Sequence, residues 1–478
     1  MSSNQISMSK EGIKVLIGKF VAALSGLVGI IVYANILGAS GLGLYYLSHA
    51  VATILSKPSE GLGIASEKKG SEIPTNISSY NSTSFMLVIV YVTFISIILF
   101  LLYNNLSYLN NSLPRQTIVY LTIILVILFS IFSVLSRFYS GMGEPGDSVI
   151  IDAYRGIVET GLQITLLVVY GMGVEGLLIG TAISLILSII YLLFMTRISF
   201  DIPDKNSIKD IYLFSKWSIP TKTIKDIYYR MDTIIIGLIL TPAAVGIYEA
   251  AMRIITPSKY VAYAIERPLL VRVSQDRANN KPVNHLLDDI VPYASILPIP
   301  LAIGGYFVGS ELLEVMYGSE FSSGFIILTG GAIYFAIHSH SNVLSEYLHG
   351  FNAPRPVTKS VIIGSIVRFV LLIVFASFIG LTGVAIAIII AESIRFTILV
   401  ISVDKVCSKV YKPVKVINQI KSGIIMGFVI FVISIIPYQS DISLLIVTIP
   451  IGGIVYFSVL IYTDRKIKNY LQDNIKIV

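Results

Sequence analysis

The chain has 478 residues, of which 55% are hydrophobic and 13% are charged, and its mean hydropathy is +0.81. Soluble globular domains carry about 25% charged residues, so this composition cannot supply a surface that faces water on all sides. It excludes most classes of soluble enzyme and indicates a protein of the lipid bilayer. The net charge of +7 does not point to a nucleic-acid partner, because the basic residues follow the distribution of a membrane protein.

Several kinds of reactive site are missing from the sequence. The single cysteine, Cys407, excludes an internal disulfide framework and a cysteine metal cluster. The chain has no phosphate-binding Gly-x-x-x-x-Gly-Lys-Ser/Thr loop, no His-Glu-x-x-His motif and no Gly-x-Ser-x-Gly motif. We therefore expect no metal site, no cofactor and no ATP hydrolysis by such a loop. The first dozen residues are polar, and we expect no removable signal peptide.

Apolar runs predict an all-α protein with fourteen membrane spans, each about 20 residues long. The thirteenth run, residues 423–436, is short, and it reaches full length only if the helix begins before Lys421. The fourteen runs start near Ile13, Leu42, Phe85, Ile118, Val149, Val174, Leu213, Val245, Ile290, Phe325, Val357, Val384, Gly423 and Leu444.

The basic residues between these spans lie on one side of the membrane. With fourteen spans, 26 Lys and Arg residues fall on the side of the N-terminus, against Arg115 alone on the opposite side. Segments rich in Lys and Arg remain in the cytoplasm, so both termini are predicted to be cytoplasmic. We expect a multi-pass protein of the cell membrane.

The spans are predicted to form an internal repeat. Three pairs of landmarks recur in the same order with offsets of 203, 209 and 210 residues, which indicates two six-helix halves of the same orientation followed by two additional helices. Parallel repeats in transporters bind substrate between the halves near the membrane midplane; the alternative is a duplicated scaffold with no central cavity. The predicted division is 1–200, 201–410 and 411–478. The landmark pairs are 36–45 with 239–248, 141–145 with 350–354, and 173–174 with 383–384.

Four polar stripes run along the predicted spans at helical spacing. An ionisable group at the bilayer centre costs about 2.5–3.5 kcal/mol, so these stripes must face protein or water. The stripes are Lys222, Lys225, Asp226, Tyr229, Arg230 and Thr233 in the seventh span, Asp152, Arg155, Glu159 and Gln163 in the fifth, His338, Asn342, Ser345, Glu346 and His349 in the tenth, and His49, Thr53, Ser56 and Glu60 in the second. Arg368 and the pairs Glu249 with Arg253 and Glu392 with Arg395 complete the set.

These charges have two interpretations. Acid and base at i, i+3 or i, i+4 can simply neutralise each other within a helix, as for Glu392 with Arg395 or Asp152 with Arg155. Lys222 can extend to the cytoplasmic edge, and buried histidines such as His338 are commonly packing residues. The seventh span, however, has more bases than acids, which favours an anionic guest such as phosphate or pyrophosphate.

The glycine-rich landmarks resemble a known family. Residues 35–45 (NILGASGLGLY), 61–68 (GLGIASEK), 232–237 (DTIIIG) and 245–253 (VGIYEAAMR) resemble oligosaccharide flippases of the polysaccharide biosynthesis (Wzx-like) type. These belong to the multidrug, oligosaccharidyl-lipid and polysaccharide (MOP) exporter superfamily. Asn35 departs from the pattern, because relatives often carry a basic residue there.

The resemblance implies a V-shaped pair of six-helix lobes that alternate between inward-open and outward-open states. It implies a flippase that moves a polyprenyl-linked sugar, bearing phosphate or pyrophosphate, from the cytoplasmic to the outer leaflet. We expect the headgroup phosphate to meet Arg253, Arg230, Lys225, Arg368, Arg155 and Lys222, and the sugar to meet Asn342, Ser345, Gln163 and Tyr229. Coupling to H⁺ or Na⁺ would use carboxylates, for which the candidates are Asp232, Glu249, Asp152, Glu159, Glu346 and Glu392.

Two other functions are alternatives to the flippase. A cation-coupled multidrug exporter of the same superfamily would prefer a cavity dominated by carboxylates, whereas these stripes lean basic. A membrane glycosyltransferase or ligase usually needs a large loop or domain for its donor and acceptor, and the loops predicted outside the membrane are all short. The expected partners are membrane lipid, the lipid-linked oligosaccharide and the polymerase or glycosyltransferase machinery that makes and uses it.

Overall fold

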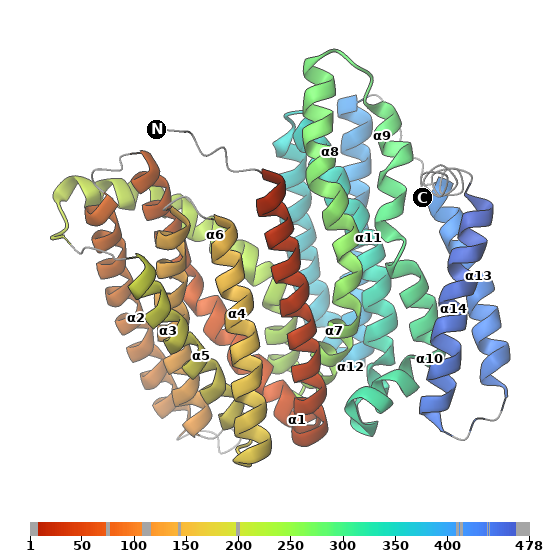
Figure 1. Ribbon diagram of the computed structural model, residues 1–478, viewed down its shortest axis with the longest axis horizontal. Helices are drawn as coiled ribbons and strands as arrows, with labels where there is room; N and C mark the ends of the chain where they lie inside the picture. The colour runs from red at the N-terminus through yellow and green to blue at the C-terminus, as the bar shows by residue number, and fades with distance from the viewer. Residues whose placement is uncertain are drawn as a thin grey trace. The chain divides into compact units, whose positions relative to one another are not determined.

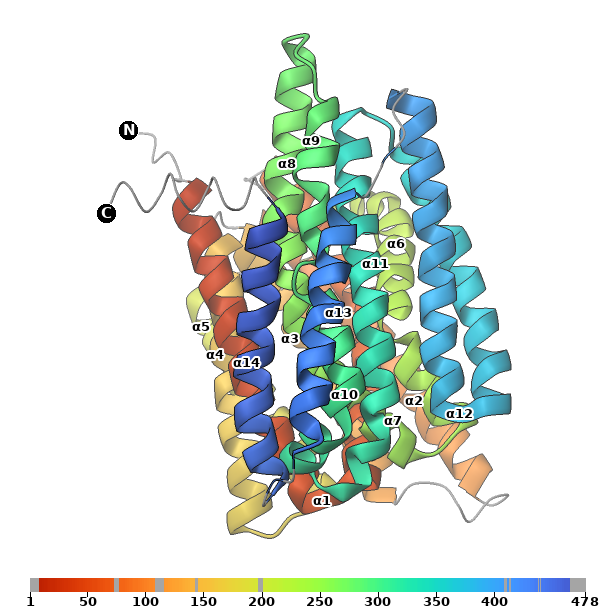
Figure 2. The ribbon, with the colours of Figure 1, turned by 90° about the vertical axis from the view of Figure 1, so that its right-hand side faces the viewer.

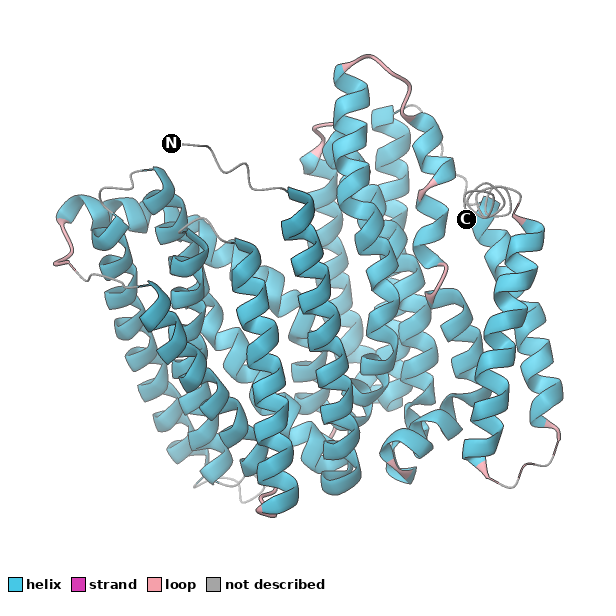
Figure 3. Cartoon of the chain, viewed as in Figure 1, coloured by secondary structure: helices cyan, strands magenta, loops and turns pink. Residues whose placement is uncertain are grey.

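The computed structural model describes residues 8–72, 77–107, 116–141, 145–196, 201–407, 411, 414–436, 438 and 440–464. Within these ranges every regular element is a helix (Figure 3), as the apolar runs predict. Two compact units divide the chain, unit 1 (Met1–Gly237) and unit 2 (Leu238–Val478). The division of 1–200, 201–410 and 411–478 stays a prediction.

Unit 1 is a bundle of long helices that run along one another (Figure 1). Its helices are α1 (Met8–Glu72), α2 (Ile77–Ser107), α3 (Gln116–Gly141), α4 (Pro145–Ile164), which continues into a π-helical turn at Thr165–Val169, α5 (Val174–Thr196) and most of α6 (Lys205–Ile239).

Unit 2 contains the remaining helices, and α13 and α14 lie side by side within it (Figure 2). Its helices are α7 (Pro242–Ile255), α8 (Tyr260–Ala278), α9 (Asn284–Asp289), α10 (Pro298–Tyr317), α11 (Phe325–Gly350), α12 (Pro354–Cys407), α13 (Val414–Ser434) and α14 (Asp441–Thr463). Short 3-10 turns at Thr256–Lys259, Val291–Ser295 and Ser319–Gly324 connect several of them.

Two of these helices are hairpins rather than straight rods. The 65 residues of α1 break at Gly38 (φ 66°), and the 54 residues of α12 break at Ile379 and Gly380 (φ 59°). In Figure 2 the two limbs of α12 run alongside each other, and the position of a Cβ on Gly364 would lie 3.2 Å from Cβ of Arg395 on the opposite limb. Only glycine adopts positive φ without strain, which is why both reversals occur at glycine.

Among the described residues, nine helical stretches are long and apolar enough to cross a membrane. Two of them, Leu24–Glu72 and Pro354–Cys407, contain 49 and 54 residues, about twice the length of one span, and each contains a hairpin. The protein is therefore a multi-pass membrane protein. The shortest predicted span is a full helix, because α13 begins at Val414, well before Lys421. The total of fourteen spans and their repeat remain predictions.

The helix α6 packs with unit 1. The hydroxyl of Ser218 donates to the carbonyl oxygen of Gly61 at 2.9 Å. A Cβ on Gly61 would lie 2.8 Å from Cα of Ile219, so the missing side chain lets the two backbones approach. This contact gives a physical reason for the glycine at the start of the GLGIASEK segment.

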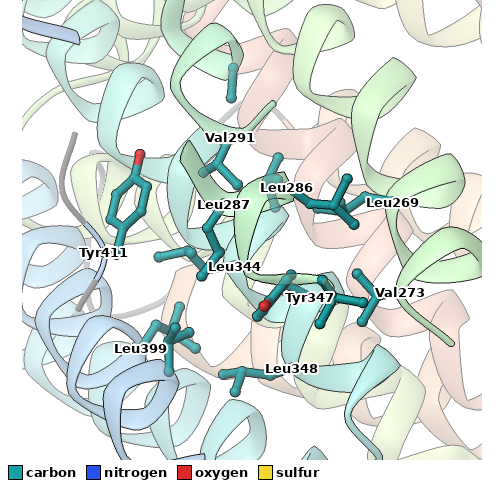
Figure 4. Packing of buried hydrophobic residues seen from close by; sticks show 14 of the residues in the cluster. Leu269, Val273, Leu286, Leu287, Val291, Leu344, Tyr347, Leu348, Leu399 and Tyr411 are labelled. Carbon is teal, nitrogen blue, oxygen red and sulfur yellow. The ribbon is translucent and has the colours of Figure 1, made fainter. Parts of the chain in front are cut away.

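A hydrophobic core joins four helices of unit 2, and two of them, α11 and α12, also carry the polar network described below. Buried leucine, valine and tyrosine side chains from α8, α9, α11 and α12 meet there (Figure 4), and close van der Waals packing of this kind holds helices together in a membrane. This packing fixes α11 against α12. The labelled members of the core are Leu269, Val273, Leu286, Leu287, Val291, Leu344, Tyr347, Leu348, Leu399 and Tyr411.

Candidate functional site

Glu60 is the centre of an ion cluster in unit 1. Its Oε2 lies 2.9 Å from Nζ of Lys57, while its Oε1 lies 2.7 Å from Nη2 of Arg137 on α3 and 3.3 Å from Nζ of Lys222 on α6. The Glu60 side chain is only 11% exposed. One carboxylate surrounded by three cations therefore holds α1, α3 and α6 together.

Asp226 is a second carboxylate partner for Lys222 on α6 and for Lys57 on α1. Its Oδ2 lies 3.3 Å from Nζ of Lys222 and 3.5 Å from Nζ of Lys57. Lys222 thus pairs with carboxylates on two helices instead of only extending toward the membrane edge. Glu60 on α1 thereby offsets the charge of one cation of the seventh span.

Glu67 extends the cluster along α1. Its Oε2 lies 3.4 Å from Nη1 of Arg137, and its Oε1 accepts a hydrogen bond of 2.9 Å from the hydroxyl of Ser140. Arg137 consequently bridges two carboxylates that stand two turns apart. The ion cluster of unit 1, as defined here, consists of Lys57, Glu60, Glu67, Arg137, Lys222 and Asp226.

Arg155 pairs with acids of its own helix. Its Nε lies 3.1 Å from Asp152 and its Nη1 lies 2.5 Å from Glu159, at i−3 and i+4 on α4. The guanidinium also stands 5.5 Å from the ring centroid of Phe132, a cation–π distance. The fifth span therefore contains acid–base pairs within one helix, as the interpretation of intrahelical neutralisation predicts.

Gln163 is the centre of a buried hydrogen-bond network in unit 1. Its Oε1 accepts from the hydroxyl of Tyr33 at 2.6 Å, and its Nε2 donates to the hydroxyls of Tyr45 and Thr181, each at 2.9 Å. Thr181 in turn donates to Oε1 of Glu159 at 2.9 Å. The amide joins both limbs of α1 to α4 and α5, and in this conformation its polar atoms are used within the protein.

Glu392 is the acidic centre of a second network, in unit 2. Its Oε1 lies 3.1 Å from Nη1 of Arg395, and its Oε2 lies 3.3 Å from Nδ1 of His338 on α11. All three side chains are buried, with exposures of 2–5%. The pair of Glu392 with Arg395 is therefore more than intrahelical neutralisation, because a histidine from the neighbouring helix completes it.

Asn342 connects the arginine and the histidine of this network. Its Oδ1 accepts from Nη2 of Arg395 at 3.1 Å, and its Nδ2 lies 3.2 Å from Nε2 of His338. The amide stands one turn beyond His338 on α11. Asn342, which the sequence suggested as a sugar contact, here orients two other side chains.

Arg368 adds a second buried guanidinium to the same unit. Its Nη1 donates to the hydroxyl of Tyr334 at 3.1 Å, and its Cζ lies 4.9 Å from the centroid of that ring. The Tyr334 hydroxyl is also 3.4 Å from Nδ1 of His338. Arg368 thereby joins the network of His338, Asn342, Glu392 and Arg395.

The other predicted site residues occupy varied environments. Asp232 and Ser345 are buried, and the Ser345 hydroxyl donates to the carbonyl of Ser341 at 2.7 Å. The side chains of Lys225 and Tyr229 lie outside the part of the chain that the structure describes. The half-buried residues among the candidates are Arg230, Glu249, Arg253 and Glu346.

Sequence reasoning missed some members of these clusters. Lys57 and Arg137 are among the 26 basic residues that the sequence places between the spans on the side of the N-terminus, and His338 is predicted to be a packing residue. Their partners come from other helices, so no spacing along the chain identifies them; only the spacing of Glu60 and His338 within polar stripes gave a signal. In the described ranges, no group of three or more His, Cys, Asp or Glu side chains is placed to hold a metal ion.

Solved structures share this fold. The Lipid II flippase MurJ in an inward closed conformation aligns with a TM-score of 0.76 at 18% identity, over 95% of this chain and 99% of that chain. An inward-facing multidrug resistance MATE family transporter of the MOP superfamily aligns with a TM-score of 0.64 at 13% identity, over 81% and 96% of the two chains. The helices thus have the fold of the MOP exporters.

The sequence defines the family more narrowly. Residues 73–325 match the model of the polysaccharide biosynthesis protein family, and the chain belongs to that family. The probable low-salt glycan biosynthesis flippase Agl15 of Haloferax volcanii is 24% identical over 390 residues, 80% of either chain. The probable flippase AglR of the same organism is 25% identical over 292 residues, 60% of this chain and 61% of the relative.

Proposed function

We propose that the chain is a flippase that translocates a polyprenyl phosphate- or pyrophosphate-linked oligosaccharide from the cytoplasmic to the outer leaflet by alternating access. The product would serve the synthesis of a surface polysaccharide or glycoprotein. The protein is then a transporter and not an enzyme. Its termini face the cytoplasm, its membrane is the cell membrane, and its partners include the polymerase or glycosyltransferases that use and make the cargo.

One observation carries this proposal. A chain of the polysaccharide biosynthesis family buries guanidinium, carboxylate, imidazole and amide groups in otherwise apolar membrane helices, most compactly at Arg368, Glu392 and Arg395. Such groups are costly in a membrane, and where they occur they commonly mark a substrate or ion pathway. The relatives named as glycan biosynthesis flippase and Lipid II flippase support the cargo class.

The proposed phosphate contacts are cations that exchange partners during the cycle. Lys222, Arg155 and Arg368 are held by Glu60, Glu159 and Tyr334 in this conformation. An entering phosphate would replace those partners, since guanidinium binds phosphate in a bidentate manner. The remaining proposed contacts are Arg230, Arg253 and Lys225 for phosphate, and Asn342, Ser345, Gln163 and Tyr229 for sugar.

Translocation by the purified protein in liposomes tests the function. A fluorescent pyrophosphate-linked oligosaccharide should become accessible to a membrane-impermeant quencher only in vesicles that contain the protein. A double variant with Arg230→Ala and Arg253→Ala should lose translocation while inserting normally. Arg272→Ala is the matched control, because that guanidinium is 65% exposed and should be dispensable. Normal translocation by the double variant would remove both arginines from the site.

The multidrug exporter is the second candidate, favoured only by the shared MATE fold. Energy would come from H⁺ or Na⁺ in either case, with Asp152, Glu159, Asp232, Glu249, Glu346 and Glu392 as proposed carboxylates. The same vesicles distinguish the two functions. Counterflow of a lipophilic cation without oligosaccharide translocation would establish the exporter.

A further inference from the structure

The first part of α6 is too polar for the hydrocarbon layer of a bilayer. Charged side chains within that layer are rare and costly, and this segment of 205–217 contains several of them. Figure 1 shows the segment, in yellow-green, crossing one end of the unit 1 bundle. Composition and placement both favour a membrane surface for it. The charged residues are Lys205, Lys209, Asp210 and Lys216.

The polar side chains of this segment are bonded to the protein. The hydroxyl of Ser79 on α2 donates to the hydroxyl of Ser207 at 3.0 Å, and the hydroxyl of Tyr80 donates to Oδ2 of Asp210 at 3.1 Å. Ser207 and Ser215 are both buried. These contacts determine which face of α6 is turned toward unit 1 and which is turned outward.

The outward face carries large apolar and aromatic side chains. Trp217 is 72% exposed and Tyr212 is 64% exposed, and Ile224 further along the helix is exposed as well. A surface in contact with water would have little use for these side chains, whereas Trp and Tyr are enriched where a bilayer meets water. The outward face therefore suits the headgroup level of a membrane.

A row of lysines runs along the same face. Steps of four and seven residues place its members on one line of the helix, and all of them are exposed. Nζ of Lys216 lies 6.0 Å from the centroid of the Trp217 ring, so cation and aromatic surface are adjacent. A lysine stem can cover apolar surface while its ammonium group reaches the headgroups. The row consists of Lys205, Lys209 and Lys216.

We propose that this face of α6 binds anionic phospholipids, with the lysine row contacting headgroup phosphates while Tyr212 and Trp217 insert between the lipids. The leaflet concerned is the one at this end of unit 1, which the basic residues predict to be cytoplasmic. An anionic lipid matches both features of the surface, since it supplies phosphate for the ammonium groups and acyl chains for the apolar side chains.

The acids of the segment do not oppose such a ligand from the lysine row. Asp204 accepts a hydrogen bond from Ser79, and Asp210 accepts one from Tyr80, so both carboxylates are bonded to α2. The lipid-binding face uses none of the residues proposed to contact the cargo. It therefore does not depend on the flippase function.

Trp217 is the single tryptophan of the chain, so its fluorescence reports on this surface alone. The full-length protein is reconstituted in vesicles of equimolar phosphatidylcholine and phosphatidylglycerol, with dibrominated acyl chains on one lipid or on the other. Bromine quenches tryptophan that it contacts. The ratio of the two quenching efficiencies should favour phosphatidylglycerol, by about fivefold in relative affinity for each lysine engaged at low ionic strength. The preference should largely vanish in about 1 M salt, where the Debye length is about 3 Å.

Removing the lysine row tests its role. A triple variant with Lys205→Gln, Lys209→Gln and Lys216→Gln should be quenched equally by the two brominated lipids. Because Lys216 contacts the tryptophan ring, the two efficiencies are compared within each protein and not between proteins.

A matched control loses the same net charge elsewhere. Its three substitutions remove exposed cations of unit 2 and should leave the preference for phosphatidylglycerol at the wild-type value. They are Lys281→Gln, Arg355→Gln and Lys359→Gln.

Several results would overturn the proposal. Equal quenching of the wild type by the two lipids would remove the selectivity. A preference that survives in the lysine variant, or that the control loses to the same extent, would assign it to the overall charge of the protein. Quenching of Trp217 by aqueous acrylamide but by neither brominated lipid would place this face in water and would favour a protein partner instead.

Discussion

At the scale of single residues, buried charges act through partners on other helices. Spacing along the chain identified Glu60, Lys222, Asn342 and Glu392 as polar positions on apolar helices. It could not identify that Glu60 meets Arg137, because that contact joins residues 77 apart in the sequence. Candidate residues could thus be predicted from helical periodicity. Their pairing could not, because it depends on how the helices of the bundle pack against one another.

Glu60→Gln should weaken the attachment of α6 to unit 1. The substitution leaves Lys57, Arg137 and Lys222 facing one another with one counter-charge fewer. We expect a loss of about 2–3 kcal/mol, below the value for a fully buried pair because these cations are partly exposed. The measurement is the thermal unfolding midpoint in one fixed detergent.

Glu72→Gln provides the comparison for Glu60. Glu72 also pairs with two lysines, Lys68 and Lys69, but its side chain is 43% exposed. Water and salt screen exposed pairs, so this variant should unfold close to the wild type. Equal midpoints for the two variants would contradict a structural role for Glu60.

The carboxylate of Asp204 caps the N-terminus of α6, and we expect the stabilisation from this cap to depend on pH. Its Oδ1 accepts from the backbone N–H of Ser207 and from the hydroxyl of Ser79, both at 3.0 Å. Hydrogen bonds from the hydroxyl and the backbone N–H of Ser207 hold the pKa of Asp204 below its usual value. A lowered pKa in the folded state means that the stabilisation is present at neutral pH and is lost as the pH falls below about 4.

Hydrogen exchange of the first-turn amides of α6 measures the cap. After correction for intrinsic rates, exchange should accelerate below about pH 4 in the wild type. Asp204→Asn should remove that acceleration, because Asn also caps helices but does not titrate. The same acid response in both proteins would assign it to another group.

At the scale of helices, reversals of chain direction within continuous apolar segments determine the topology. The runs that begin near Val357 and Val384 were predicted as separate spans, and they are the two limbs of α12. A glycine is a common residue in membrane helices, so the sequence could not single out Gly380 as the reversal point. Gly380 and Gly171, 209 residues apart, both have positive φ (59° and 63°), and the repeat itself stays a prediction.

Gly380→Ala should destabilise the hairpin of α12 through the backbone alone. A Cβ at this position would meet nothing within 4 Å, so the cost of about 1–3 kcal/mol comes from the backbone conformation, φ +59° with ψ −138°. Gly453→Ala in α14 also has open space but lies in regular helix, where alanine is favoured by about 0.5–1 kcal/mol. Opposite shifts in the thermal midpoint are expected, and shifts of the same sign would contradict the backbone argument.

At the scale of the whole molecule, composition and charge were sufficient for the class of protein. The scarcity of charged residues predicted a multi-pass helical membrane protein, and the glycine-rich landmarks predicted the exporter superfamily; the fold and the family confirm both. The clusters of unit 1 and unit 2 could not be assembled from the sequence, since each depends on contacts among three or more helical segments.

The most direct measurement compares two cargoes in vesicles that contain the purified protein. One is an oligosaccharide on polyprenyl pyrophosphate, and the other is the same oligosaccharide on uncharged polyprenol. Recognition of phosphate by buried cations predicts rapid translocation of the first and little or none of the second. Equal rates for the two lipids, or movement of neither, would contradict the account.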